Sequence, residues 1–442
     1  MTRNVKQAAR QLLQVLPYSI RNYNRYVGHF SGLLHQLSLL SETALRDWQF
    51  ERFRSLAERA YQHSPFYREL YDRAGTPPQI LRHPDDIQRL PLIDKDLVRA
   101  NSKRLVLQGV PQGRLSAVMT SGTNGSPLTL YVDAAAAGAE MAAIVHQWER
   151  VGYRSEMGRI EFRGRVDGPE LVVHFPRERI LRVNINRLNP ANMPALLQQI
   201  QACSYAFYHG YPSALERFAR LLEQTTQAGT LRPPLAILLA SEMVFPRQLE
   251  LLASVFPHSR LFAHYGQAER VALGAWVGHS RSYHFLPGYA IVEQDEAGRL
   301  IGSSLVNEVM PLLRYRTTDV VSGFHPHPMG TSHLFPVVES IEGRLEDQLC
   351  TPAGDFVSPA RVTFPFKEGS SYSACKLIQH TPDRLELVME SSRPAAELQH
   401  EFEDITAKLR GVFGPAMHFQ LTQVQEIPRL PSGKFKWVES RV

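Results

Sequence analysis

A loop of small hydroxyl residues and glycines stands between two expected strands, LSAVM (115–119) and LTLYV (128–132). The loop reads TSGTNGSP (120–127), so its side chains and its glycine N–H groups can fold over a polyphosphate and later release it. A nucleoside-triphosphate P-loop is excluded, because Gly125 is followed by Ser126 and Pro127 rather than by a lysine and a helix. The G-x-G-x-x-G pattern of dinucleotide-binding folds is also absent. An ordinary polar hairpin is the simpler interpretation of this loop when it is taken alone.

Four further motifs follow the loop in order: FAHYGQAE (262–269), PLLRYRTTD (311–319), GRLEDQL (343–349) and PRLPSGKFKWV (428–438). Together the five motifs resemble those of the adenylate-forming superfamily, which includes acyl-CoA synthetases, peptide-synthetase adenylation domains and luciferases. HGYPSAL, ASEMVFPRQLELL and IPRLPSGKF resemble the phenylacetate-CoA ligase group in particular. The nearest likeness is to its branch of proteins associated with capsular polysaccharide biosynthesis.

This resemblance implies an α/β fold with two domains. Residues 1–343 would form a large N-terminal domain of helix-covered sheets that binds ATP and the acid, and residues 344–442 a small, mobile α+β domain that carries the catalytic lysine. The implied reaction joins a carboxylate to the α-phosphate of ATP with release of pyrophosphate. Holding an anionic acid beside an anionic phosphorus requires fixed positive charge, which motifs of this kind supply.

The resemblance also implies a role for each motif residue. Lys434 would bridge the carboxylate and the α-phosphate, and Glu269 would hold Mg²⁺, which prefers hard oxygen ligands. Arg344 and Glu346 lie where the domains meet, so Arg344 is expected to assist catalysis and Glu346 to act at the hinge, although a plain surface pair explains Glu346 nearly as well. Tyr265 would stack on adenine, and Asp319 would accept hydrogen bonds from the ribose hydroxyl groups. The implied ATP-binding residues are Thr120, Ser121, Gly122, Thr123, Asn124, Gly125, Ala240, Ser241, Glu242, Tyr265, Gly266 and Asp319.

The acyl pocket is expected where a strand ends and a helix opens, at Tyr208, His209, Gly210 and Tyr211. His209 and Tyr211 suggest an acid that contains a ring or a hydroxyl group, although a capped core helix explains them equally well. One departure from the family pattern is Ser126, which stands where many relatives have a lysine. The loop would therefore lack one charge directed at the phosphates.

Five histidines lie in or near a region where some relatives carry cysteine pairs: His279, His284, His325, His327 and His333. They could form a zinc site. Closed structural zinc sites usually include thiolates, and no cysteine is near these histidines, so metal binding there is the less favoured interpretation.

The composition describes a globular chain of 442 residues, 43% hydrophobic and 21% charged, which is long enough for two or three domains. The net charge of +6 is spread among acidic residues without a basic block, which favours a solvated surface over nucleic-acid binding. Three widely spaced cysteines indicate a reducing compartment, and no stretch resembles a secretory signal or a membrane span, so we expect a cytoplasmic protein. The basic, amphipathic N-terminal segment (1–28) either packs on the domain or touches an anionic membrane surface.

Residue periodicity places these motifs on alternating helices and strands. A helix is expected over 41–75, a β/α alternation over 115–241, and a tail with two strands, a helix over 395–411 and a final strand. This order predicts sheets covered by helices and a small C-terminal unit.

Three functions fit the motifs. The first is an ATP-dependent acid ligase that transfers its acyl-adenylate to the thiol of CoA or of a carrier phosphopantetheine, in polysaccharide or secondary-metabolite biosynthesis. The second is a synthetase that passes the same adenylate to an amine or a sugar hydroxyl. The third is a non-catalytic partner in a glycan-assembly complex, and the presence of Glu269, Asp319, Arg344 and Lys434 counts against it.

Overall fold

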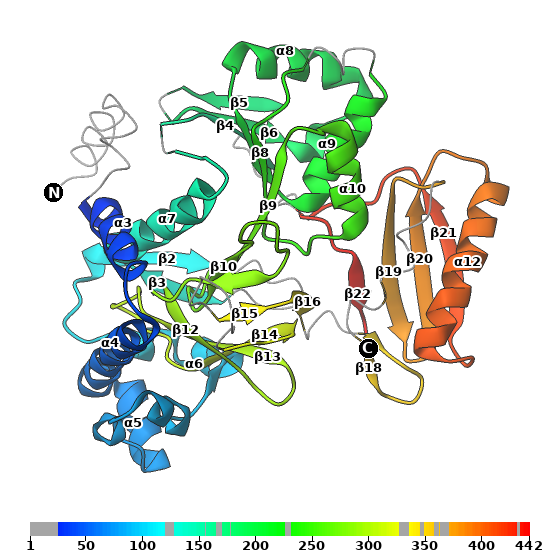
Figure 1. Ribbon diagram of the computed structural model, residues 1–442. Coiled ribbons are helices and arrows are strands. Elements are labelled where there is room, and N and C mark those ends of the chain that lie inside the picture. Colours follow the sequence, from blue (N-terminus) through cyan, green and yellow to red (C-terminus); the bar gives the residue numbers. More distant parts are fainter. Residues whose placement is uncertain are drawn as a thin grey trace.

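A computed structural model describes residues 25–119, 128–154, 156–164, 170–176, 178–225, 231–326, 336–344, 349–357, 362, 371–430 and 434–442. Figure 1 shows two blocks of sheet and helix, with a smaller lobe formed by the C-terminal residues beside them. None of the described helices is long and apolar enough to cross a membrane.

The largest sheet has nine strands in the order β15-β11-β10-β9-β8-β7-β4-β6-β5 and extends through both blocks. In Figure 1, β4, β5, β6 and β8 lie in the upper block, whereas β10 and β15 lie beside the strands of the lower block. Strands β9, β8, β7, β4 and β6 run parallel, so their carboxyl ends lie at one edge. Every residue of β7 and β8 is buried, as expected for parallel strands covered on both faces. The strands are β4 (Arg159–Arg163), β5 (Val172–Phe175), β6 (Ile180–Asn184), β7 (Phe207–Gly210), β8 (Ala236–Ala240), β9 (Arg260–Gly266), β10 (Leu273–Ala275), β11 (Tyr283–Phe285) and β15 (Val337–Val338). Helices α8 (Met193–Cys203), α9 (Pro212–Glu223) and α10 (Pro246–Val255) connect the parallel strands.

The lower block contains a five-stranded sheet in which β14 is paired with β1, β13 and β16. Its strands are β1 (Ile93–Asp94), β12 (Ala290–Gln294), β13 (Arg299–Ser304), β14 (Tyr315–Ser322) and β16 (Ser340–Arg344). The helix expected over 41–75 is two helices, because Pro65 cannot continue the first and Ser64 caps the second by accepting the Tyr67 N–H. The helices here are α3 (Arg25–Leu37), α4 (Glu42–His63), α5 (Pro65–Ala74), α6 (Lys95–Leu105) and α7 (Ala134–Glu149). The hairpin β2 (Ser116–Met119) and β3 (Thr129–Val132) confirms the two strands expected around the hydroxyl-rich loop.

Short 3₁₀ helices mark the connections of both blocks: η1 (Pro78–Ile80), η2 (Pro84–Arg89), η3 (Gln112–Arg114), η4 (Ile185–Arg187) and η5 (Pro190–Asn192).

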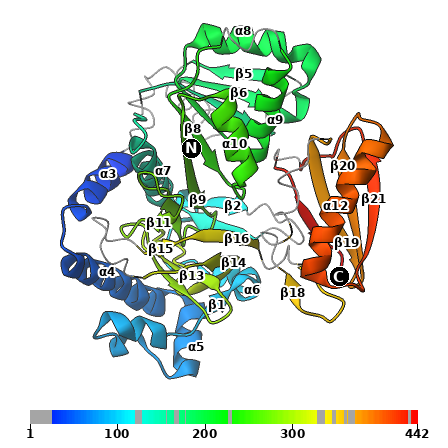
Figure 2. The same cartoon turned by 45° about the vertical axis from the view of Figure 1, so that its right-hand side comes forward.

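The C-terminal lobe is a four-stranded sheet in the order β21-β20-β19-β22, with α12 on the face turned away from the rest of the molecule (Figure 1). In Figures 1 and 2, β22 is the edge strand nearest to the other blocks. The expected strand, strand, helix and strand of the tail are therefore present. The elements are β17 (Leu349–Cys350), β18 (Phe356–Val357), β19 (Ala374–Thr381), β20 (Arg384–Glu390), α12 (Ala395–Phe413), β21 (His418–Val424) and β22 (Val438–Ser440).

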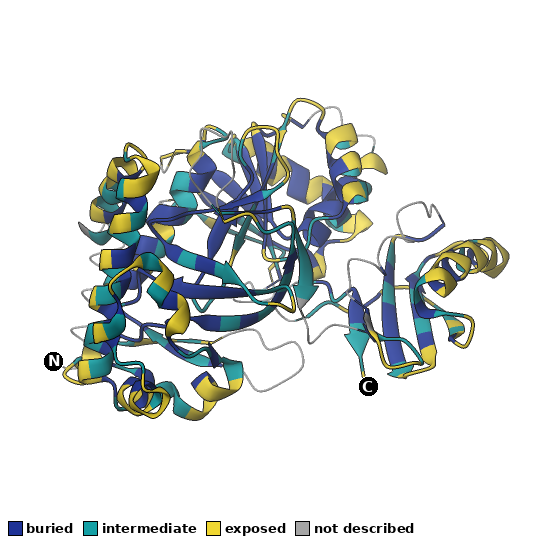
Figure 3. Ribbon diagram, turned by 60° about the horizontal axis from the view of Figure 1, so that its bottom comes forward, coloured by how far each residue is buried: buried dark blue, intermediate teal, exposed yellow. Residues whose placement is uncertain are grey.

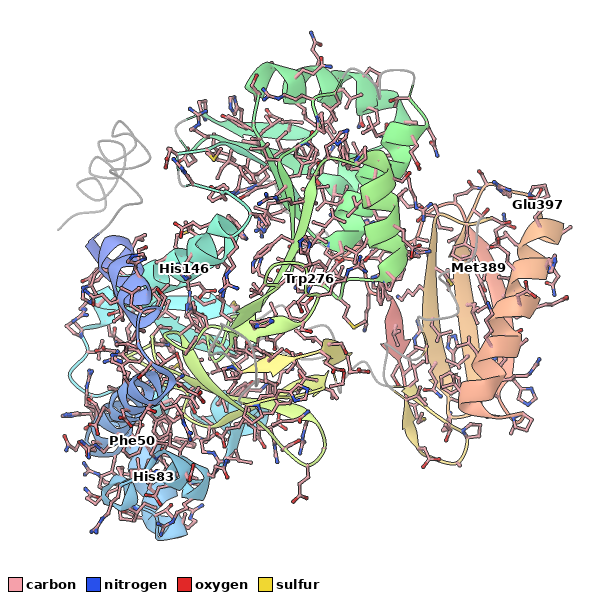
Figure 4. The ribbon with its side chains drawn as sticks, in the orientation of Figure 1. Phe50, His83, His146, Trp276, Met389 and Glu397 are labelled. Carbon is pink, nitrogen blue, oxygen red and sulfur yellow. The ribbon has the colours of Figure 1, made fainter. Side chains whose placement is uncertain are left out.

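Each block has its own buried core, seen as dark blue strands in Figure 3. Figure 4 labels one residue of each of three cores: Phe50 on α4, Trp276 beside the nine-stranded sheet, and Met389 in the C-terminal lobe. Met243 and Phe245, which lie between β8 and α10, pack into the core of the lobe. The lobe is thus a separate packing unit that is attached to the large sheet near the end of β8.

Candidate active site

The predicted site residues of the nine-stranded sheet gather at its carboxyl edge. β7, β8 and β9 are parallel neighbours, with Gly210 opposite Leu239 and Ala240 opposite His264. Tyr211 and Ser241 follow directly after two of these strands. A site at such an edge is the usual arrangement in open α/β sheets.

A hydrogen-bonded group of three side chains lies at the end of β9. The Tyr265 hydroxyl donates to Asp319 Oδ2 over 2.5 Å, and Gln267 Nε2 donates to the same oxygen over 2.8 Å and also to the Tyr265 hydroxyl. Burial raises the pKa of Tyr265 well above its ordinary value, and the carboxylates of Asp319 and Glu269 raise it further. Arg344 is the cross-strand partner of Asp319 on β16, so the hinge motif reaches this group through its backbone.

Gln267 is a residue that the sequence interpretation missed. It lies inside the motif FAHYGQAE, between Tyr265 and Glu269. This position in the motif was the only feature of the sequence that could have indicated a role in the site. Because it bonds both Tyr265 and Asp319, it holds the two predicted nucleotide-binding side chains together. The predictions of adenine stacking for Tyr265 and ribose binding for Asp319 stay predictions.

Glu269 lies on a tight turn after β9 and is half-buried. The next residue, Arg270, has a left-handed φ of 57° and forms an ion pair with Glu140 of α7, which anchors the turn. Within the described parts of the chain, no group of three or more His, Cys, Asp and Glu side chains could hold a metal ion by itself. A single carboxylate that shares Mg²⁺ with phosphate oxygens and water is the usual pattern for this ion, so Glu269 fits the predicted role.

Lys434 comes to the same edge from the C-terminal lobe. Its Nζ lies 5.8 Å from the ring centroid of Tyr211, which is the first residue after β7. The adjacent Phe435 N–H donates to Glu242 Oε1 over 2.8 Å, and the Ser213 N–H donates to Glu242 Oε2 over 3.2 Å. Burial raises the pKa of Glu242, whereas these N–H groups and Arg429 act in the opposite direction. Glu242, expected beside the adenine, thus connects the lysine segment to helix α9.

The chain reaches Glu242 through Ser241, which has a left-handed φ of 67°. A left-handed backbone conformation is strained in a residue other than glycine, so it persists only where the surrounding structure enforces it. Such residues are found often at functional sites.

Two further contacts dock the lobe. Arg429 donates from Nη1 to Ser213 Oγ over 2.8 Å and from Nη2 to Ser213 O over 3.1 Å. Phe245 packs edge-on against Trp437, with ring centroids 5.1 Å apart. These contacts place the Lys434 segment against α9 and α10.

The acyl-pocket residues divide between the two faces of β7, because successive strand side chains point to opposite faces. His209 packs against Trp148 and His264, with ring centroids at 4.8 and 6.1 Å, on the face that continues to Tyr211. Tyr208 is fully buried on the other face, among Phe162, Phe218 and Phe256. We therefore assign Tyr208 to the core rather than to the pocket.

Gly210 keeps β7 close to β4. A Cβ atom at this position would lie 2.8 Å from the backbone oxygen of Phe162, so a side chain there would push the strands apart. Its role is to allow this close approach of the two strands.

Other predicted residues lie outside the described parts of the chain. They are Thr120, Ser121, Gly122, Thr123, Asn124, Gly125, Glu346, His327 and His333. The described histidines His279, His284 and His325 are not part of any group that could hold a metal ion. His325 instead lies 3.9 Å from Glu339, with both side chains well exposed.

Comparison with known proteins supports the expected relationship. Residues 349–441 match the family model of the CapK C-terminal domain. The phenylacetate-coenzyme A ligase of Thermus thermophilus is 24% identical over 461 residues, covering 91% of this chain and 98% of that protein. The crystal structure of 2-hydroxyisobutyryl-CoA ligase in the postadenylation state superimposes with a TM-score of 0.69, at 17% identity and 89% coverage of each chain. The same ligase in its thioesterification state gives a TM-score of 0.55, at 17% identity and 91% and 90% coverage.

The fold is therefore that of the adenylate-forming CoA ligases, as the motifs predicted. Within that class, the chain is similar to the phenylacetate-coenzyme A ligase group over most of its length, and its C-terminal lobe is similar to the CapK C-terminal domain.

The docking contacts predict that Arg429→Gln releases the C-terminal lobe. The variant loses the charge-assisted bonds to Ser213, which are worth about 1.5–3 kcal/mol. Hydrogen–deuterium exchange should rise in β22 and at the start of α9, and the lobe should separate from the large blocks in small-angle scattering. Arg393→Gln is the matched control, because Arg393 pairs with the exposed Glu397 on α12. Equal exchange in the wild type and the Arg429 variant would contradict this docking role.

His264 predicts a loss of stability in mild acid. Burial lowers its pKa from 6.5 to about 4, so the folded protein resists the protonation that the unfolded chain accepts. Its contribution is complete above pH 6.5 and is lost as the pH falls toward 4, which amounts to about 2 kcal/mol at pH 5. Denaturant unfolding at pH 7 and pH 5 should show a smaller drop for His264→Asn, whose amide oxygen can still accept from Trp148. The same drop in both proteins would contradict this assignment.

Proposed function

We propose that this protein is an AMP-forming acid ligase. The observation that carries the proposal is that Lys434, from the C-terminal lobe, lies at the same sheet edge as the Tyr265, Gln267 and Asp319 group and the Glu269 turn. Similarity to a phenylacetate-coenzyme A ligase and to a ligase crystallised with an acyl-AMP supports it.

In the first half-reaction a carboxylate oxygen attacks the α-phosphorus of ATP. The bond from that phosphorus to the oxygen bridging to the β-phosphate breaks, and pyrophosphate leaves. Lys434 neutralises the approaching carboxylate and the α-phosphate, and Asp319 and Tyr265 hold the nucleoside. Mg²⁺, held by Glu269, would offset the charge of the leaving pyrophosphate.

In the second half-reaction an acceptor attacks the acyl carbonyl carbon, and AMP leaves. We propose that the acceptor is a thiol, of CoA or of a carrier phosphopantetheine, because the similar 2-hydroxyisobutyryl-CoA ligase was crystallised with CoA in a thioesterification state. An amine or a sugar hydroxyl is the second candidate. The resemblance of the motifs to the capsular polysaccharide branch leads us to propose a place in polysaccharide or secondary-metabolite biosynthesis.

We propose that the lobe position found here is the one used in the first half-reaction. The same relative superimposes better in its postadenylation state than in its thioesterification state, with TM-scores of 0.69 and 0.55. Lys434 would have to leave the edge before an acceptor could enter, and Arg344 and Glu346 lie where the chain would turn.

ATP–pyrophosphate exchange across aryl, alkyl, hydroxy and amino acids tests the proposal, followed by acceptor screening with CoA, amines and sugars. Exchange that depends on one class of acid supports a ligase. If none of the acids supports exchange, the result would favour a non-catalytic partner of a glycan-assembly complex.

Lys434→Ala should lower acid-dependent pyrophosphate exchange by about a hundredfold or more, because a fixed charge that stabilises the transition state is removed. The variant should still consume a supplied acyl-adenylate with the acceptor at nearly the wild-type rate. Lys436→Ala is the matched control, because this neighbouring lysine acts on Glu439 within the lobe. Equal loss of both half-reactions would rule out separate lobe positions for the two steps.

Glu269→Gln keeps the shape of the side chain and removes its charge. The Mg²⁺ concentration needed for half-maximal exchange should rise by about tenfold or more. Glu296→Gln, on an exposed turn, serves as the control. An unchanged Mg²⁺ dependence in the Glu269 variant would remove this residue from the metal site.

A further inference from the structure

Glu161 is a buried carboxylate whose hydrogen bonds are already filled by two arginines. It lies on β4 with 3% of its surface exposed. Arg159 contacts Oε1 at 2.9 Å from Nε and 2.8 Å from Nη2, and Arg182 contacts Oε2 at 3.0 Å from Nε and 2.8 Å from Nη2. Burial alone would raise the pKa of Glu161, but the surrounding arginines hold it below its ordinary value. This carboxylate therefore has no strong bond left for a third cation.

A third arginine lies on the same face of β4, one row closer to the carboxyl edge. Arg163 Nε is 3.8 Å from Glu161 Oε2, which is too long for a hydrogen bond. Its Nε atom is buried and has no hydrogen-bond partner among the described residues. The Arg163 guanidinium group lowers the pKa of the Tyr211 hydroxyl, against the larger effect of burial.

The histidines of this face do not balance the charge. Burial and the neighbouring arginines lower the pKa of His209 well below 6.5, and burial lowers that of His264 to about 4, so both rings are neutral at pH 7. His209 Nδ1 is buried, 4.0 Å from Glu161, and has no hydrogen-bond partner in the described part of the chain. Three guanidinium groups thus face one carboxylate and two neutral imidazoles.

Lys434 and Arg163 occupy different parts of the Tyr211 side chain. Lys434 lies over the ring, whereas Arg163 acts on the hydroxyl group at its end. In the proposed function, Lys434 is occupied by the reacting carboxylate and the α-phosphate. Arg163, whose side chain is 38% exposed, is then available to a different part of the same acid. A guanidinium group recognises carboxylate and phosphate groups through paired hydrogen bonds.

We infer that the acid substrate carries a second anionic group, a carboxylate or a phosphate, and that Arg163 binds it with His209 beside it. This inference rests on the proposed function and defines its substrate class as an acid with two anionic groups. Among the described residues, a neutral ring or alkyl acid would give Arg163 no counter-charge beyond Glu161, which two other arginines already bond.

Three acids of equal length test the inference: a diacid, its half-amide and the unsubstituted monoacid. In ATP–pyrophosphate exchange, the wild type should favour the diacid by about tenfold or more in kcat/KM. Arg163→Gln should lose this preference, mainly through a higher KM for the diacid. Arg179→Gln is the matched control, because Arg179 lies over the Tyr205 ring at the amino end of β6. It should keep the preference.

Two outcomes would overturn the inference while leaving the ligase proposal intact. One is a wild-type preference for the monoacid, and the other is an equal loss for all three acids in Arg163→Gln, which would place Arg163 at the reacting carboxylate. If no acid supports exchange, the proposed function fails. The inference is then tested separately by measuring acid binding through the melting temperature. The diacid should then raise the melting temperature of the wild type more than the half-amide does, and no such difference should remain in Arg163→Gln. Arg163→Lys keeps the positive charge but cannot form the paired hydrogen bonds of a guanidinium group, so it should retain part of the preference. This variant also provides a test if the glutamine variant does not fold.

Discussion

The carboxylate of Glu242 joins the two parts of the molecule that must meet for chemistry to occur. One oxygen accepts the N–H of Ser213 at the start of α9, and the other accepts the N–H of Phe435 in the C-terminal lobe. Because Phe435 follows Lys434 directly, this side chain helps to position the lysine, together with the Arg429 and Phe245 contacts. The bond uses a backbone N–H of the lobe, so it fixes the path of the chain without engaging the lysine side chain.

The docking surface around this carboxylate combines polar contacts with a small aromatic one. Arg429, Ser213 and Glu242 supply hydrogen bonds, and Phe245 packs against Trp437. Each polar group that is released can be satisfied by water, so separation costs much less than opening an apolar core would. The lobe also keeps its own core when it leaves, apart from Met243 and Phe245. An interface of this kind suits the proposed function, in which the lobe would position the lysine for one step and separate before the next.

The sequence predicted the fold better than it predicted the contacts. Motif order located Glu269, Asp319, Arg344 and Lys434, and hydrophobic periodicity located the strands and helices around the nine-stranded sheet and in the lobe. The sequence could not show that Glu242 accepts a hydrogen bond from a residue 193 positions later, because that contact exists only when the C-terminal lobe docks on the large sheet. The alternation of strand side chains could have separated Tyr208 from His209, but the strand limits had to be known first.

The strand β4, RIEFR, shows why part of the pocket escaped notice. Its alternate residues are charged, a pattern typical of an exposed surface, yet Arg159 and Glu161 are buried. Burial is tolerated because Arg182, from the neighbouring β6, completes the bonds of Glu161. The face with Arg163 and His209 thus depends on pairing within the sheet, whereas the lysine segment depends on docking of the lobe. Under the proposed function, changes at Arg163 and His209 would alter which acid is bound, while Glu242 and Lys434 would keep the same activation step.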